Sequence, residues 1–106
     1  MEVAETKLQQ ERGLMFVKSL PFNSGMLFVY QDEAPRAFYM KNTYIPLDII
    51  WMDKGRKVVF IKKNAQPSNL NAYETILPPD EAMYVLELNS GSADKIGLSI
   101  GDTLRF

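Results

Sequence analysis

The stretch LDIIWMDKGRKVVFIK, residues Leu47 to Lys62, decides the fold of this 106-residue chain. Two apolar runs, Ile49 to Met52 and Val58 to Ile61, are separated by the short segment Asp53 to Lys57, of which Asp53 to Arg56 are expected to form the loop. A short loop between two runs of β-forming residues predicts an antiparallel hairpin, with Gly55 placed for a positive φ. Because both runs are apolar at every position, not at alternate ones, both faces of the hairpin should be covered. The hairpin is therefore expected at the centre of the fold.

Further runs of β-forming residues lie on both sides of this hairpin, each bounded by Gly, Pro, Asn or Asp. They cover Met26 to Tyr30, Ala37 to Met40, Tyr73 to Leu77, Met83 to Leu88 and Thr103 to Phe106. In the run that ends at Leu88, Tyr84, Leu86 and Leu88 alternate with Val85 and Glu87, which predicts a strand with one face closer to water.

Two short helical segments are predicted near the ends of the chain. Thr6 to Gln9 has the form of a capping box, and Gly13 supplies a stop, so a helix is expected from about Lys7 to Arg12. Towards the C-terminus, Ser90 or Ser92 could cap a helical turn that Gly97 ends.

The fold class that follows is mainly β. We expect a small, partly open β-barrel or bent antiparallel sheet, with one or two short helices plugging its ends. A chain of this length ordinarily builds one hydrophobic core, so residues 1–106 are expected to form a single domain.

Composition excludes several functions. The twelve basic and thirteen acidic residues are interleaved and give a net charge of −1, so no stripe of one sign is available to follow nucleic acid. The chain has no cysteine and no histidine, which removes disulfides, thiol nucleophiles, zinc–thiolate sites and His-based triads. No metal ion or other cofactor is therefore expected.

No apolar stretch reaches the length needed to span a bilayer, and the N-terminus lacks the pattern of a signal peptide. The chain as given is therefore expected to be soluble. A precursor trimmed of an upstream signal or anchor would look the same, so export or anchoring of a longer precursor stays open. The oligomeric state is not indicated by the sequence.

The densest group of polar side chains lies between two predicted strands: Lys41, Asn42, Thr43 and Asp48, close to Tyr39. With Arg12, these residues form a candidate rim for binding an unknown small molecule or protein, because loops on a rigid sheet often carry function. In the alternative interpretation, the side chains only hold their own turn. Asp48 would then accept hydrogen bonds from loop amides or pair with Lys41 or Arg12.

An enzyme is the second functional hypothesis. Lys41 and Asp48 would act as base and acid if burial moved their proton affinities towards neutrality. No activated nucleophile, paired carboxylate motif or phosphate-binding glycine loop accompanies them, so no catalytic residue is assigned. A non-catalytic binding or interaction module is the preferred interpretation.

Four phrases of the sequence are specific as a set: Glu11 to Phe16, Gly25 to Val29, Phe38 to Thr43 continuing to Ile45 to Ile49, and Tyr84 to Leu88 followed by Gly97 and Gly101-Asp102. Together they resemble the uncharacterised bacterial and archaeal family known as domain of unknown function 192. The resemblance covers nearly the whole chain. It implies a small, mostly β domain, often found behind a signal peptide or a membrane anchor, with no established biochemical activity.

Overall fold

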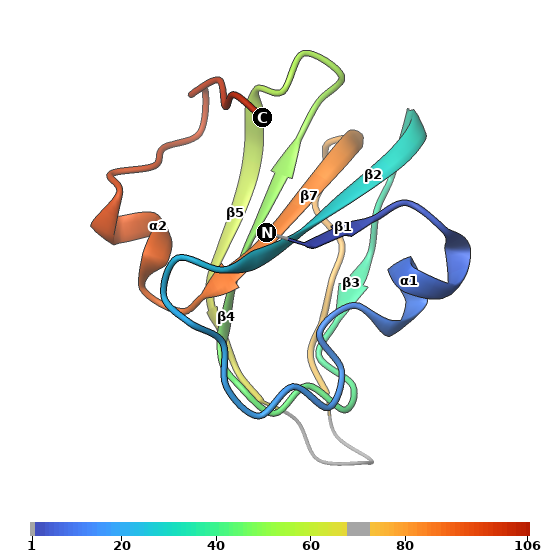
Figure 1. The fold of residues 1–106 in the computed structure, drawn as a ribbon. Helices are drawn as coiled ribbons and strands as arrows, with labels where there is room; N and C mark the ends of the chain where they lie inside the picture. Colours follow the sequence, from blue (N-terminus) through green and yellow to red (C-terminus); the bar gives the residue numbers. More distant parts are fainter. Residues whose placement is uncertain (1, 68–72) are drawn as a thin grey trace.

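The computed structural model describes residues 2–67 and 73–106 (Figure 1). Its elements in chain order are β1 (Glu2–Ala4), α1 (Lys7–Arg12), β2 (Gly25–Ala34), β3 (Phe38–Tyr39), β4 (Leu47–Met52), β5 (Val58–Ala65), β6 (Thr75–Ile76), β7 (Ala82–Asn89) and α2 (Ser92–Lys95). Five strands form one sheet in the order β1-β2-β7-β4-β5, and β3 pairs with β6 in a second, two-stranded sheet. The predicted class, mainly β with two short helices, is confirmed.

The five-stranded sheet is open, not closed into a barrel, because β1 and β5 form its two edges. β1 pairs with β2 in parallel, and the other pairs are antiparallel. The register shifts between Val29 and Ala34 where β2 pairs with β7. Irregularities of this kind bend strands.

The predicted hairpin is present as β4 and β5, with Ile50 opposite Ile61 and Trp51 opposite Phe60. Every residue of β4 is buried, which confirms that both faces of this strand are covered. The prediction of a fully covered, central hairpin was wrong for β5, which is an edge strand and is buried only at its two ends, Val58 and Ala65. The prediction for the turn was wrong in one respect, because the positive φ belongs to Arg56 and not to Gly55. The Asp53 carboxylate accepts hydrogen bonds from the backbone amides of Gly55 and Lys57, and this side chain closes the turn.

Alternate residues of the central strands face two separate apolar clusters, as the two-residue period of a strand requires. Leu47, Ile49 and Trp51 of β4 belong to one cluster, together with Phe28 and Phe38. On the other face, Ile50 and Met52 pack with a second cluster that includes Ala93 of α2 and the nearby Leu98. Figure 1 shows α1 and β3 on one side of the sheet and α2 on the other, so the helices cover faces instead of plugging barrel ends.

The prediction that Glu87 lies on a face of β7 closer to water was wrong. Glu87 is only 6% exposed, although alternation along the strand indicated a face closer to water. It lies opposite Met26 of β2 and Ile49 of β4. Both neighbours belong to the cluster that packs against the α1 side, so the face that carries Glu87 is covered.

Both helices are short, and they differ in how their N-termini are capped. α1 has the predicted bounds and capping box, with the Thr6 side chain accepting a hydrogen bond from the Gln9 amide, and Gly13 after it has a φ of 50°. α2 has Gly91 at its N-cap and no cap from its own side chains, so the prediction of a Ser90 or Ser92 cap was wrong.

A closing strand over Thr103 to Phe106 was also predicted, and it is not formed. This segment contributes one isolated bridge, between Lys57 and Thr103. Leu104 of the same segment packs, partly buried, against the cluster on the α2 side. The segment therefore covers part of that face without joining the sheet.

Gly25 at the start of β2 tests the packing of the central strands. A Cβ at this position would lie 2.6 Å from the backbone oxygen of Glu87 and 2.6 Å from a Leu88 side-chain carbon. Gly25→Ala is therefore expected to lower the free energy of unfolding by about 2 kcal/mol, measured by urea denaturation. Gly55→Ala is the control, because a Cβ there would meet one side-chain atom, Asp53 Oδ1 at 3.3 Å, and no backbone atom within 4 Å. Equal stability of the two variants would contradict the close approach at Gly25.

Candidate functional site

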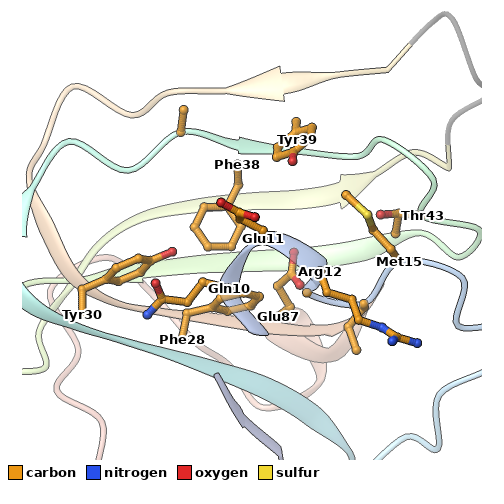
Figure 2. A pocket seen from close by; sticks show the side chains of 13 residues that line it. Gln10, Glu11, Arg12, Met15, Phe28, Tyr30, Phe38, Tyr39, Thr43 and Glu87 are labelled. Atoms are coloured by element: carbon orange, nitrogen blue, oxygen red, sulfur yellow. The ribbon is translucent and has the colours of Figure 1, made fainter. Parts of the chain in front are cut away.

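A cavity of about 60 Å³ lies between α1 and the sheet face that carries Glu87 (Figure 2). Residues of α1 and the turn after it line one side, and β2 and β7 supply the floor. Ala37, the two residues of β3 and Thr43 complete the lining. We call this cavity the Glu87 pocket.

The Glu87 carboxyl lies at the floor of the pocket. Within residues 2–67 and 73–106, no hydrogen bond or ion pair engages this side chain. Gly13 leaves room above it, because a Cβ there would lie 3.6 Å from Glu87 Oε1. Burial raises the pKa of the Glu87 carboxyl from an ordinary 4.5 to about 8, since removal from water disfavours the charged form. The Glu87 carboxyl is therefore mainly protonated at neutral pH.

Aromatic rings form the walls of the pocket. The rings of Phe28 and Phe38 meet edge to face with centroids 4.8 Å apart, and Phe38 makes a similar contact with buried Trp51 at 5.7 Å. Tyr30 also lines the pocket, with the Arg36 guanidinium 3.9 Å above its ring centroid. Burial raises the pKa of Tyr30 to about 12, so its hydroxyl stays protonated across the physiological range.

Gln10 of α1 is held in place at one side of the pocket. Its side-chain nitrogen donates to the carbonyl oxygen of Val29 at 2.8 Å, and it also lies 3.4 Å from the carbonyl oxygens of Ala4 and Glu5. These contacts anchor α1 to β1 and β2. With the nitrogen engaged, the amide oxygen is the atom that Gln10 can present to the pocket.

Three of the residues predicted for the rim, Arg12, Tyr39 and Thr43, line the Glu87 pocket. Thr43 is buried and its hydroxyl donates to the carbonyl oxygen of Lys41 at 3.3 Å. Tyr39 is 41% exposed and packs its ring against Tyr73. In Figure 2 the Arg12 guanidinium points away from the Glu87 carboxyl.

The other predicted residues of this loop lie outside the pocket lining. Lys41 is exposed. Asn42 has a φ of 55°, a conformation that asparagine tolerates better than most residues, and its carbonyl oxygen accepts a hydrogen bond from the Phe16 amide. These two residues belong to the turn that carries Thr43 to the pocket.

Asp48 faces the opposite side of the sheet from Glu87 and is 1% exposed. Its Oδ1 accepts a hydrogen bond from the Asn64 amide at 2.9 Å, and its Oδ2 accepts from the amides of Gly91 at 3.1 Å and Ala93 at 2.9 Å. The carboxylate therefore supplies the cap that α2 lacks in its own sequence. These contacts agree with the interpretation in which Asp48 holds loop amides.

Glu87 was missed as a site residue because alternation in β7 was interpreted as exposure. A signal was present in the sequence: Val85 lies two residues earlier on the same face and is apolar. A carboxyl in phase with Val85, beside a hairpin covered on both faces, is expected to be buried. What the sequence does not reveal is that α1 packs over this position.

The fold and the pocket together define a small, mainly β domain with a pocket floored by a buried carboxyl. The whole chain, residues 1–106, matches the family DUF192, described as Uncharacterized ACR. The protein belongs to this family, which confirms the resemblance seen in the sequence.

Relatives of the chain include proteins of archaea and bacteria. It is 28% identical to the UPF0127 protein TK1120 of Thermococcus kodakarensis and 26% identical to a UPF0127 protein of Thermococcus gammatolerans, over 98% of this chain in each case. The chain spans 62% and 64% of the lengths of these two relatives.

Two solved structures are similar over almost the full chain. One, from Novosphingobium aromaticivorans, is a protein of unknown function with a TM-score of 0.91 and 35% identity, over 99% of this chain and 73% of that one. The other, from Sinorhizobium meliloti 1021, is provisionally named a transcription regulator, with a TM-score of 0.90 and 36% identity, over 98% of this chain and 78% of that one. Among the residues that the structure describes, no helix is long and apolar enough to cross a membrane.

Proposed function

We propose that this domain is a non-catalytic module that binds a small ligand in the Glu87 pocket, with Arg12, Tyr39 and Thr43 at its rim. The observation that carries the proposal is Glu87, a residue that is 6% exposed and lines the pocket, and whose carboxyl has no hydrogen bond or ion pair among residues 2–67 and 73–106. A buried polar group without a partner destabilises a fold by about 1–3 kcal/mol or more. Its presence at the floor of a cavity is explained if a ligand supplies the missing partner.

In this proposal, Lys41, Asn42 and Asp48 act as supports for the rim. Asp48 joins the start of β4 to Asn64 of β5 and to the N-terminus of α2, and Asn42 forms the turn that positions Thr43. The six residues that the sequence predicted for the rim are thereby divided into three that line the pocket and three that support it.

The enzyme hypothesis is less well supported for Lys41 and Asp48. Both oxygens of Asp48 already accept backbone hydrogen bonds, and Lys41 is exposed outside the pocket lining. One observation favours an enzyme with a different residue, because a carboxyl with a pKa of about 8 can donate a proton at neutral pH. Glu87 is then the general acid, and turnover of a bound compound distinguishes this alternative from simple binding.

The test is a screen of metabolites and glycans by NMR chemical-shift changes, with the wild type, Glu87→Gln, Tyr39→Ala and Tyr44→Ala. A compound that binds the pocket is expected to lose affinity about tenfold or more with Glu87→Gln, because a charged or strong hydrogen bond contributes about 1.5–3 kcal/mol. Tyr39→Ala should also weaken binding. Tyr44→Ala is the matched control, since Tyr44 lies on the loop after β3, has a similar exposure and is not among the residues that line the pocket.

Two outcomes contradict the proposal. Equal affinity of Glu87→Gln and wild type for every bound compound would place the ligand elsewhere. Chemical conversion of a compound, abolished by Glu87→Gln, would replace the binding module with the enzyme.

A further inference from the structure

We propose that the ligand presents a small organic ammonium group to Glu87 and displaces the proton of the carboxyl as it binds. This inference rests on the proposed function of the Glu87 pocket. The proton leaves for solvent, and the ammonium becomes the counter-ion of the resulting carboxylate. The inference concerns the chemical class of the ligand and comes from the charges, walls and size of the pocket.

The polar atoms around the pocket favour a cation. The Glu87 carboxyl and the carboxylate of exposed Glu11 both belong to the lining, and Gln10 has its nitrogen engaged with backbone carbonyls. These groups offer hydrogen-bond acceptors. A ligand with N–H donors and a positive charge satisfies them together.

The cationic side chains closest to the pocket do not neutralise Glu87. Arg36 pairs with Asp32 at 2.7 Å and donates to the carbonyl oxygen of Ala82. Arg12 points its guanidinium away from the carboxyl in Figure 2. No ion pair to Glu87 occurs within the described ranges 2–67 and 73–106. When the carboxyl is ionised, no cationic side chain of the described ranges is therefore its counter-ion.

The walls and the volume of the pocket fit an organic ammonium group. Phe28, Tyr30 and Phe38 line the space around the carboxyl, and aromatic faces attract cations. A cavity of about 60 Å³ is smaller than the cavities of about 150 Å³ that admit benzene, so it suits a group of a few non-hydrogen atoms, such as an ammonium on a short alkyl chain. In the described part of the chain, no group of three or more His, Cys, Asp or Glu side chains is placed to hold a metal ion.

The direction of the pH dependence separates a cation from a neutral ligand. The titratable or charged groups that line the pocket with Glu87 are Glu11 and Arg12 of α1, Tyr30 of β2 and Tyr39 of β3, and the Arg12 guanidinium points away from the Glu87 carboxyl (Figure 2). Burial raises the pKa of Glu87 to about 8, so the free pocket holds a proton below that pH. An ammonium that binds the ionised carboxyl gains affinity by about tenfold per pH unit from pH 5.5 to 7.5. A neutral ligand that accepts a hydrogen bond from the protonated carboxyl shows no such gain.

The experiment is an NMR titration with methylammonium, ethylammonium and n-propylammonium chlorides, and with methanol, ethanol and 1-propanol as neutral counterparts of similar shape. Titrations at pH 5.5, 6.5 and 7.5 use the wild type, Glu87→Gln and, as matched control, Glu81→Gln at an exposed position before β7. We expect ammonium affinity to rise about 100-fold across this range in the wild type and the control. In Glu87→Gln the affinity should fall by about 10- to 100-fold at pH 7.5 and lose its pH dependence.

Glu11→Gln is a second variant that keeps the test decisive if Glu87→Gln folds poorly. Because Glu11 is exposed, its neutralisation should weaken ammonium binding about two- to fivefold and leave the pH dependence intact. If alcohols or screened neutral compounds bind in a Glu87-dependent manner and ammonium ions do not, the ligand class is overturned and the binding module remains. If no compound of either kind perturbs the pocket, the proposed function fails together with the inference.

Discussion

Glu87→Gln is expected to make the domain more stable than the wild type by about 4 kcal/mol at pH 8 and to leave stability unchanged near pH 4. The pKa of this carboxyl is about 8 in the folded protein, against an ordinary 4.5. Between these values, the folded state holds a proton that the unfolded state has released. The free energy of unfolding of the wild type therefore falls by about 1.4 kcal/mol for each pH unit from about 4.5 to 8.

Glutamine has nearly the same shape as the protonated carboxyl and carries no charge at any pH, so this decline should be absent from the variant. Urea denaturation at pH 5, 6, 7 and 8 measures the difference between the two proteins. Glu81→Gln is the matched control and should follow the wild type, because Glu81 is exposed. Parallel stability curves for wild type and Glu87→Gln would show that Glu87 ionises freely in the folded domain.

Asp48→Ala is expected to lower the free energy of unfolding by about 4 kcal/mol and the Tm by roughly 20 °C. The substitution leaves the backbone amides of Asn64, Gly91 and Ala93 without the carboxylate that accepts their hydrogen bonds. It also removes the N-terminal cap of α2. Thermal unfolding followed by circular dichroism measures the effect.

The control for Asp48 is Asp102→Ala. The exposed Asp102 carboxylate accepts one backbone hydrogen bond, from the Ser99 amide at 2.8 Å, so about 1 kcal/mol is expected. A loss for Asp48→Ala no larger than that of the control would contradict the role of Asp48 as a structural acceptor.

Stability and binding should respond to Glu87 in opposite directions. A residue retained only for packing stabilises its fold, whereas a buried carboxyl without a partner destabilises it and is explained by function. If Glu87→Gln is both more stable and weaker in ligand binding, these two results together support the proposed function. Neither result alone does so as strongly.

The local parts of the fold could be predicted from the sequence. The β4–β5 hairpin follows from two apolar runs and a short turn, and α1 follows from the Thr6 capping box; both depend on residues close together in the chain. The cap of α2 could not be predicted in this way, because Asp48 lies 43 and 45 residues before the amides that it binds.

The candidate site was predictable only in part, for a similar reason. The loop that carries Tyr39 and Thr43 was recognised by its polar residues, and both line the pocket. The floor of the pocket depends on α1 packing over Glu87, a contact between opposite ends of the chain. The alternation of residues within β7 does not show that α1 covers this face, so the Glu87 side chain was predicted to be closer to water.

The hydrogen bonds of Asp48 also bear on the order of folding. α2 has four residues, far too few to form a helix by itself, and its anchor lies on a distant strand. The C-terminal segment is therefore expected to dock only after β4 and β7 have paired. Docking then takes place after the chain has passed the folding transition state. Loss of the Asp48 contacts should then act mainly by accelerating unfolding, with little change in the refolding rate.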